Sequence, residues 1–574
     1  MMKKGLRIVI LSLIAGFHLI GDMQSQQKDY YQAPLDIPLY LSGSFGELRG
    51  SHFHAGIDFK TQAEIGKNIY AAADGYISRI KIQTGGYGRA LYINHPNGET
   101  TVYAHLHEYA PEIEKYVKAY QYRNKTHTLD LYLSSEKLKV QKGELIGISG
   151  NSGSSGGPHL HFEIRKSGNQ APVNALKYGF DVTDNIPPTI KGLAIYPLKN
   201  GLVNGQKSKL ILNPVGGNGT YSISESPVRV SGNIGFGLEA YDYMDGSHNR
   251  CGLYSLEMKI DGKRLYYHVV DEFSFIEAGY IKSHVDYEEK VKSGREFQKT
   301  FKDPNNKLGF YRQTLPTEGM PFTDEQTHTV ELIAKDTYGN SSILKFDVQA
   351  APVMGNVNTI LDNHEKGINF SYARDNHFED NEIKITVPKY ALFTDIPFFY
   401  ESYKSAALNF SSLHQVHNIY TPLYRNMTLQ IKADVPEELV EKVILVNVDK
   451  DNDHHIFNAT YEAGWVTARV KQFGPWFVDV DTLAPEIKPV NIYNGANMQN
   501  RHDIRFIVTD RHTGISSYNG YINGEWVLFE YDPKNNLIMY QFDDTRLSHG
   551  EHQLELIITD GKGNESRYNA NFRY

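Results

Sequence analysis

Three short segments in the first third of the chain carry residues that can bind a divalent metal. The segment RGSHFHAGIDF places His54 four residues before Asp58. TTVYAHLHEY contains His105, and the glycine- and serine-rich segment GNSGSSGGPHLHFEIR contains His159 and His161. Imidazole and carboxylate groups suit a borderline-soft divalent ion such as zinc. Most of the 23 histidines are expected to be ordinary surface or packed residues, so only this constellation distinguishes a few of them.

The number of candidate ligands fits a catalytic zinc site. Such a site needs three protein ligands and one open position for water, because a filled fourth position makes the metal structural. Two imidazoles and one carboxylate from two of the segments fill three positions, which leaves other histidines free to act on water or substrate. The chain contains no HExxH motif, so a site carried by one helix is unsupported. We therefore expect the site to be built on strands.

Alternation along β-strands is expected to direct the candidate side chains. In the second segment it would put Tyr103, His105 and His107 on one face of a single strand. In the third segment His159 and His161 would likewise share one face, while the intervening leucine points into the core.

Three neighbours of the candidate residues have expected roles of their own. Gly56 lies between His54 and Asp58 and would let the chain turn so that both side chains point at one centre. His52 would share a strand face with His54, and it could support a ligand or be a bystander. For His107 an ordinary exposed strand residue is favoured.

The order of the segments resembles the lysostaphin-like and LytM-like zinc metallopeptidases. The resemblance covers roughly residues 42–167 and leaves some four hundred residues uncovered. The motifs that carry it occur in the family's order: SGSFGELRGSHFHAGIDF, AAADGYI, GGYGRALYINHPNG, VYAHL and GELIGISGNSGSSGGPHLHFEIR.

The resemblance implies a role for each position. His54, Asp58 and His161 would bind one Zn²⁺ per chain, and His105 and His159 would be the catalytic residues beside it. A bound zinc lowers the pKa of its water and polarises the scissile carbonyl. The two catalytic histidines would orient or deprotonate that water and hydrogen-bond to the developing oxyanion. The family hydrolyses peptide bonds in bacterial peptidoglycan, which makes peptidoglycan peptides the expected substrate.

Two other functions stay open. A noncatalytic adaptor of the same fold would activate another cell-wall hydrolase, but such adaptors usually lack part of the metal set, and here all five positions are filled. An adhesin or glycan-binding protein would use mainly the C-terminal domains, and the enzyme domain would be incidental.

The elements that must position the candidate residues are predicted to be strands. Residues 35–180 are rich in glycine and in short apolar runs such as KNIYAAADGYISRIKI, which is typical of an antiparallel β-sheet domain. Pro96, Asn97 and Gly98 mark a tight hairpin. Residues 108–139 contain PEIEKYVKAYQY, whose spacing is helical, and this insertion could narrow the substrate groove or cover it until a partner moves it.

The rest of the chain predicts tandem immunoglobulin-like β-sandwich domains. HTVELIAKDTYGNSS and HQLELIITDGKGNES form an internal repeat, and DNIPPTI parallels DTLAPEI. The sandwiches are predicted over 184–350 and 481–574, with a separate β-rich domain over 356–480. The two copies share an aspartate, a glycine and an asparagine at identical spacing: Asp336, Gly339 and Asn340 in one, Asp560, Gly563 and Asn564 in the other. The predicted fold class is mainly β.

The N-terminal residues predict export. MMKKGLR is positively charged, IVILSLIAGFHLI is apolar and a polar stretch follows, so residues 1–25 are predicted to be a signal peptide. The protein would then be periplasmic or at the cell surface, with no membrane span after signal removal. An uncleaved N-terminal anchor is the alternative.

Composition limits the partners. The single cysteine, Cys251, excludes an intramolecular disulfide and a lipid anchor directly after the signal, and a buried apolar role is expected for it. The formal net charge of −8 argues against nonspecific nucleic-acid binding. A protein partner could dock on the C-terminal sandwiches.

Overall fold

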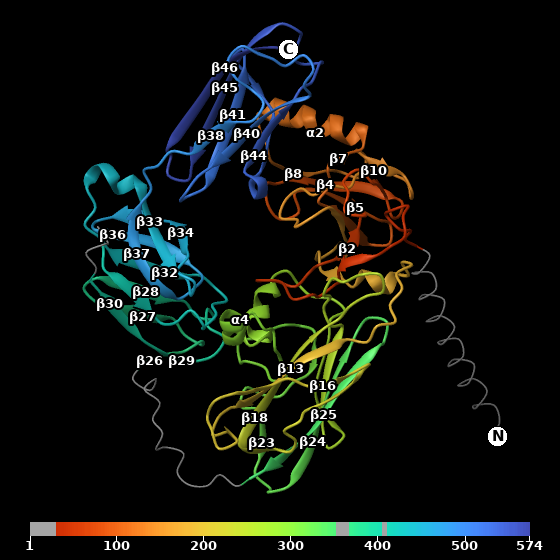
Figure 1. Cartoon of the computed structure of the whole chain (residues 1–574), viewed down its shortest axis with the longest axis vertical. Coiled ribbons are helices and arrows are strands. Elements are labelled where there is room, and N and C mark those ends of the chain that lie inside the picture. Colours follow the sequence, from red (N-terminus) through yellow and green to blue (C-terminus); the bar gives the residue numbers. More distant parts are fainter. Residues whose placement is uncertain (1–29, 352–366, 405–409) are drawn as a thin grey trace, which may run out of the picture.

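The computed structural model describes residues 30–351, 367–404 and 410–574 (Figure 1). These residues fold mostly into β-strands, with 46% strand against 8% helix, and they form separate sheets along the chain. The prediction of a mainly β chain is therefore confirmed. The predicted signal peptide lies outside the described residues, as does the beginning of the β-rich domain predicted over 356–480.

A nine-stranded antiparallel sheet dominates the N-terminal domain. A three-stranded sheet, β3 (Asn68–Tyr70), β10 (Leu145–Ile148) and β7 (Glu108–Tyr109), contributes to the same hydrophobic core. The main path of the large sheet runs in the order β1 (Leu41–Gly43), β2 (Ile57–Lys60), β11 (His159–Lys166), β6 (Glu99–Ala104), β5 (Arg89–Asn94), β4 (Gly75–Ile82) and β8 (Leu129–Tyr132).

Strand β11 shows why the sequence folds as it does here. Leu160, Phe162 and Ile164 are fully buried in the core, as the apolar positions of a strand with a period of two must be. The polar residues between them project from the opposite face of the sheet: His159, His161, Glu163 and Arg165. One strand thus supplies both core packing and a row of polar groups.

Helix α2 (Pro111–Asn124) lies within the stretch for which helical spacing was predicted. Proline opens its first turn, and Lys125 closes it in the left-handed conformation. Ile113, Val117 and Gln121 recur every four residues and are buried, so one face of the helix packs on the domain. The same stretch also supplies β8, which pairs with β4 at the edge of the sheet.

The first sandwich follows the N-terminal domain. Its longest strand, β18 (Val228–Tyr241), pairs with β13 (Thr189–Pro197) and also with β25 (Ser341–Ala350). β24 (Thr327–Lys335) forms a hairpin with β25, and this hairpin is the first copy of the sequence repeat. The apolar residues of these strands form a second hydrophobic core.

Two further β domains complete the described chain. Residues 368–480 form two five-stranded sheets and one two-stranded sheet. The residues after them form a four-stranded and a five-stranded sheet. The second repeat copy is the hairpin of β45 (Glu551–Asp560) and β46 (Glu565–Arg573). Each of the two domains has its own hydrophobic core.

The domains follow a curved path that brings the C-terminal sandwich back beside helix α2 and the N-terminal sheet (Figure 1). Specific contacts join the two ends. Arg89 forms an ion pair with Glu530, and the Nδ1 of His127 donates to the carbonyl oxygen of Phe529 at 2.8 Å. Among the described residues, no helix combines the length and the apolar character that a membrane crossing requires.

Candidate metal centre

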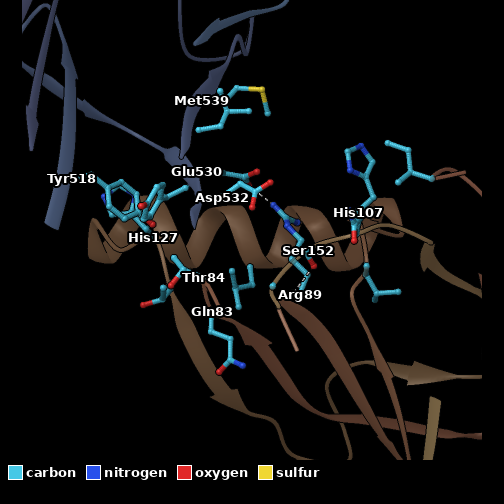
Figure 2. A pocket seen from close by; sticks show the side chains of 18 residues that line it. Gln83, Thr84, Arg89, His107, His127, Ser152, Tyr518, Glu530, Asp532 and Met539 are labelled. Carbon is cyan, nitrogen blue, oxygen red and sulfur yellow. Dashed lines mark hydrogen bonds and ion pairs between the residues drawn. The ribbon is translucent and has the colours of Figure 1, made fainter. Parts of the chain in front are cut away.

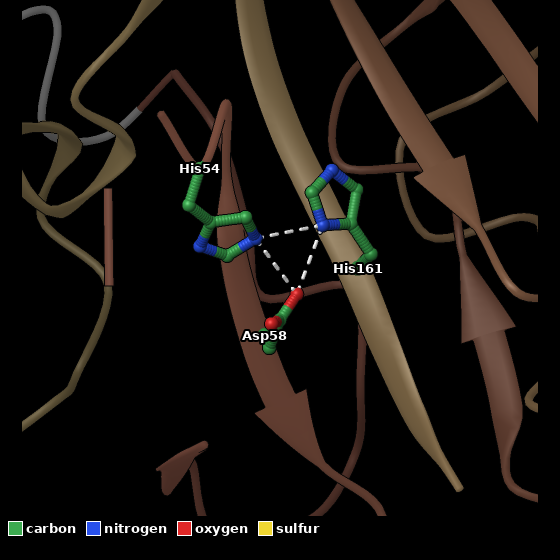
Figure 3. A group of neighbouring side chains, drawn as sticks. All are labelled: His54, Asp58 and His161. Atoms are coloured by element: carbon green, nitrogen blue, oxygen red, sulfur yellow. Dashed lines mark hydrogen bonds and ion pairs between the residues drawn. The ribbon is translucent and has the colours of Figure 1, made fainter. Parts of the chain in front are cut away.

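His54, Asp58 and His161 converge on one point in the N-terminal domain (Figure 3). His161 on β11 is paired directly with Asp58 on β2, so their side chains leave the sheet on the same face. His54 Nε2 lies 3.0 Å from Asp58 Oδ1, His161 Nδ1 lies 2.9 Å from the same oxygen, and the two nitrogens are 3.0 Å apart. All three side chains are buried.

Hydrogen bonds on the far side of each ring decide which nitrogen faces this point. His54 donates from Nδ1 to the carbonyl oxygen of Ser44 at 2.8 Å, which leaves Nε2 as a lone-pair donor. His161 donates from Nε2 to Glu163 at 2.7 Å, which leaves Nδ1. Partners of this kind hold the imidazole ligands of metal sites in one tautomer and one orientation.

Two glycines allow the close contacts that surround these three side chains. A Cβ on Gly56 would lie 2.3 Å from the carbonyl oxygen of Phe162, and a Cβ on Gly43 would lie 2.7 Å from both Arg49 and Asp58. The expected reason for Gly56, a turn of the chain, differs from what is found. Its φ is not in the left-handed region, and the glycine is required because β11 passes directly over it.

His159 and His105 lie next to this group. The ring centroid of His105 lies 4.8 Å from that of His159 and 5.8 Å from that of His161. His159 donates from Nδ1 to the carbonyl oxygen of Gly157 at 2.8 Å, while its Nε2 is buried, lacks a hydrogen-bond partner and lies 3.4 Å from Asp58 Oδ1. The structure therefore brings all five candidate residues together.

Tyr103, His105 and His107 were expected on one face of a single strand, and this expectation is wrong. β6 ends at Ala104, and His105 has a φ of 61°, in the left-handed region. Tyr103 is fully buried in the core, so strict alternation would have sent His105 there too. The left-handed residue turns the chain and directs His105 toward His159 instead.

The electrostatics of the group depend on its burial. Burial opposes ionisation of Asp58, yet nearby His54, the close approach of His159 and the hydrogen bond from His161 hold its pKa well below the usual value. Burial lowers the pKa of His54. Burial also disfavours charge on His161, but hydrogen bonds to Asp58 and Glu163 outweigh it and raise the pKa of His161 to about 9.

Sequence reasoning assigned no role to the groups that hold these ligands in place. Glu163 is fully buried and bonds to His161, to Tyr87 and to Arg165. Arg49 donates from Nη2 to Asp58 Oδ2 at 2.7 Å. The same alternation that put His159 and His161 on one face also includes Glu163, so a signal for it was present in the sequence.

The residues present fit a small divalent cation. Two imidazole nitrogens and a carboxylate oxygen are a usual donor set for zinc, whose tetrahedral ligands lie about 3.3 Å apart. The three donor atoms are 2.9–3.0 Å apart, so a shift of about 0.3 Å would open the group to that spacing. These atoms cannot face one another without a proton or a cation between them. The unpartnered Nε2 of His159 points into the same space.

A pocket lies between the N-terminal domain and the C-terminal sandwich (Figure 2). Its walls include Arg89, His107 and Ser152 on one side and Glu530 and Asp532 on the other. His107 thus lines this pocket, its side chain half exposed, while His52 is exposed on the surface.

Comparisons with known proteins agree with this geometry. The chain matches peptidase family M23 over residues 52–122 and 116–175, and a Zu5-like domain over 368–481. It is 38% identical over 123 residues to the DD-carboxypeptidase/endopeptidase Mpg of Neisseria meningitidis serogroup B, covering 21% of this chain and 22% of the relative. It is 29% identical over 171 residues to the peptidoglycan DD-endopeptidase ShyA of Vibrio cholerae serotype O1, covering 28% and 33%.

A solved structure is also similar to part of this chain. The catalytic domain of the prophage-encoded M23 protein EnpA from Enterococcus faecalis is 24% identical, with a TM-score of 0.19, and the match covers 25% of this chain and 94% of that domain. The chain spans only about a fifth to a third of the length of the curated relatives it matches.

Proposed function

We propose, from the premise that residues 52–175 are a domain of peptidase family M23, that this chain is a zinc-dependent endopeptidase that hydrolyses peptide bonds in bacterial peptidoglycan. The observation that carries the proposal is the convergence of His54 Nε2, Asp58 Oδ1 and His161 Nδ1, with both remaining histidines beside them. The names of the relatives point to the same substrate class.

In this proposal His54, Asp58 and His161 bind zinc, one ion per chain. Bound zinc supplies a Lewis acid that polarises the scissile carbonyl and acidifies a water molecule. Asp58 also offers its second oxygen to Arg49, so that its carboxylate stays ionised and oriented. Glu163 keeps His161 in the tautomer that presents Nδ1.

His105 and His159 are the proposed catalytic pair. The Nδ1 of His105 donates to the carbonyl oxygen of Ser152 at 2.8 Å, which leaves its Nε2 free to accept a proton. Burial, with the neighbouring His161 and His159, lowers the pKa of His105 to about 3, so this ring is neutral at pH 7. Each ring can take a proton from the attacking water, and the imidazolium that forms can donate to the oxyanion or to the leaving amine.

The adaptor alternative predicts a different outcome at the same site. An adaptor can retain a bound metal, but it has no need of two proton-accepting histidines beside the metal. Here both are present, and each is oriented through its Nδ1. This arrangement favours the enzyme over the adaptor.

A single preparation tests the proposal. Purified residues 26–574 are assayed for zinc content and for release of soluble muropeptides from isolated sacculi. We expect one zinc per chain, loss of zinc and cleavage in His161→Ala, and retained zinc without cleavage in His159→Ala. His107→Ala, which changes a histidine outside the metal group, serves as the matched control and should cleave normally. Full zinc occupancy with no cleavage by the wild type would leave the adaptor as the better reading.

Export and location are part of the proposal. A substrate in the cell wall requires the chain to leave the cytoplasm, for which residues 1–25 are the proposed signal peptide. A protein partner on the C-terminal sandwich would have to share its surface with the N-terminal domain, because Glu530 and Phe529 already contact that domain.

A further inference from the structure

Three buried aspartates meet at the junction between the N-terminal domain and the first sandwich. Asp184 precedes β13, Asp242 follows β18, and Asp336 follows β24. One carboxylate oxygen from each lies within 4.8 Å of the others. The three residues are only 7%, 3% and 3% exposed, respectively, so water does little to screen them from one another.

Two of the carboxylates are incompletely satisfied. Asp184 Oδ2 and Asp242 Oδ1 are buried and have no hydrogen-bond partner. Asp336 differs, because it accepts bonds from the backbone N–H groups of Gly339 at 2.7 Å and Asn340 at 2.9 Å. A buried carboxylate oxygen without a donor is costly and rare in folded proteins, so some other group must neutralise it.

The mutual repulsion of the three residues is visible in their acidity. Burial first, and then the charges of its neighbours, raise the pKa of Asp184 to about 7. The same causes raise the pKa of Asp242 to about 8, and burial raises the pKa of Asp336 against the hydrogen bonds that it accepts. Near neutral pH this cluster therefore takes up either protons or a cation.

We propose that Asp184, Asp242 and Asp336 bind a divalent cation of the calcium type. The donors that converge are all carboxylate oxygens, which are the hard ligands that Ca²⁺ prefers. Cys251, the one soft group nearby, is buried, and burial raises the pKa of its thiol to about 12, so it stays protonated. Three carboxylates and a divalent ion leave a net charge of −1 in place of −3.

The C-terminal sandwich carries a matching triad that is satisfied differently. Asp481, Asp510 and Asp560 hold the equivalent positions in the repeat. There Asp481 accepts a bond from the Thr513 hydroxyl at 2.6 Å and another from His512 at 3.2 Å. Asp510 Oδ1 is the one buried oxygen of this triad without a partner, against two such oxygens in the first triad.

The aligned positions of the first sandwich offer no such donors. Met244 stands where the C-terminal copy has His512, and Asp245 stands where it has Thr513. The chain thus provides its own hydrogen-bond donors to the second triad and an additional acid to the first. This contrast assigns the cation to the first triad.

The proposed site stands where it can stiffen the metal centre. The backbones of Asp242 and Cys251 exchange hydrogen bonds at 2.8 and 3.0 Å, which closes the loop between them. Directly after Cys251, the Gly252 N–H donates to the Ser44 hydroxyl at 2.9 Å. The Ser44 carbonyl oxygen in turn accepts the hydrogen bond from His54 Nδ1. A cation at the triad would therefore brace the loop that orients one of the proposed zinc ligands.

The test measures cation binding and does not depend on peptidase activity. Residues 26–574, freed of metal over a chelating resin, are titrated with CaCl2 by calorimetry and melted with and without CaCl2. We expect a calcium-binding event and a rise in melting temperature of about 5 °C or more at calcium concentrations well above the dissociation constant. MgCl2 should act more weakly, because Mg²⁺ gives up its water reluctantly.

The variants separate this site from its counterpart. Asp242→Asn should abolish the calcium-dependent rise, because it removes one of the three carboxylate ligands. Asp510→Asn, the equivalent change in the C-terminal sandwich, should retain the calcium-dependent rise. If Asp242→Asn does not fold, Asp184→Asn gives the same comparison.

Two results would overturn the proposal. One is a wild-type protein that neither binds calcium nor melts higher in its presence, which would mean that protons neutralise the cluster. The other is a calcium response that persists in Asp242→Asn and is lost in Asp510→Asn, which would move the site to the C-terminal sandwich.

Discussion

Glu163 shows how much of the proposed metal centre depends on a residue that is not itself a proposed metal ligand. Its carboxylate is fully buried, accepts the Nε2 proton of His161 at 2.7 Å and is itself held by Arg165 and Tyr87. Glu163→Gln should lower zinc affinity by about 10- to 100-fold, the usual effect of losing a carboxylate behind a histidine ligand. Competition with a chromophoric chelator measures the affinity. Glu108→Gln, at an exposed position, is the control, and equal affinities in the two variants would refute this role.

The raised pKa of His161 leads to a second prediction at the residue scale. Its pKa of about 9 means that the metal-free protein carries a proton on His161 at pH 7, and zinc must displace it. Apparent zinc affinity should therefore rise by up to about tenfold per pH unit between pH 7 and 9 and level off above that range. Chelator competition across this range measures it. A flat profile would contradict the raised pKa.

At the scale of the element, the contact between β2 and β11 is the feature most sensitive to substitution. Gly56→Ala would place a methyl group 2.3 Å from the Phe162 carbonyl and force the two strands apart. We expect a loss of about 1–3 kcal/mol in unfolding free energy, together with weaker zinc binding. Denaturant unfolding checks the stability. Gly168→Ala is a suitable control, because a Cβ there meets no atom within 4 Å.

Helix α2 is an integral part of the fold of the N-terminal domain. Val117 is fully buried in the core of the N-terminal domain, and β8 completes the sheet beside β4. Removing residues 108–139 would therefore expose core surface, so a deletion cannot by itself separate a covering role from a structural one. Single substitutions on the side that faces the C-terminal sandwich are the better probe.

At the scale of the whole molecule, the C-terminal sandwich touches the loop that leads to His159. Lys534 Nζ donates to the carbonyl oxygens of Asn151 and Ser155 in that loop, and Glu530 pairs with Arg89 below it. Figure 2 shows Glu530 and Asp532 directed at the N-terminal domain across the pocket. These contacts hold the sandwich beside the loop that leads to His159.

Breaking these contacts should give a large substrate easier access. The double change Glu530→Gln with Lys534→Ala is expected to raise muropeptide release from sacculi by up to about tenfold, through a shift toward an open arrangement. Cleavage of a short soluble peptide should change less, because a small substrate needs less room. Lys488→Ala, at an exposed site in the same domain, is the control. Unchanged release from sacculi would show that the sandwich does not limit access.

The convergence of several candidate residues was predictable because its cues are local. His159 and His161 share a face of β11 through simple alternation, and the spacing of His54 and Asp58 fits two ligands on adjoining chain. His105 shows the limit of that reasoning. It reaches the site through a left-handed φ of 61°, and alternation from the buried Tyr103 gives the opposite direction.

By itself, the sequence determined the donor types, the strand periodicity, the mainly β class and the repeat of two sandwiches, because each of these depends on residues close together in the chain. Tertiary structure alone decided which ring nitrogen each histidine presents, since Ser44 and Glu163 reach their partners through register and packing. It also decided that one acidic triad has two buried carboxylate oxygens without a donor while its repeat has one. Such contacts join segments far apart in the chain, and the local pattern of neither segment encodes the other.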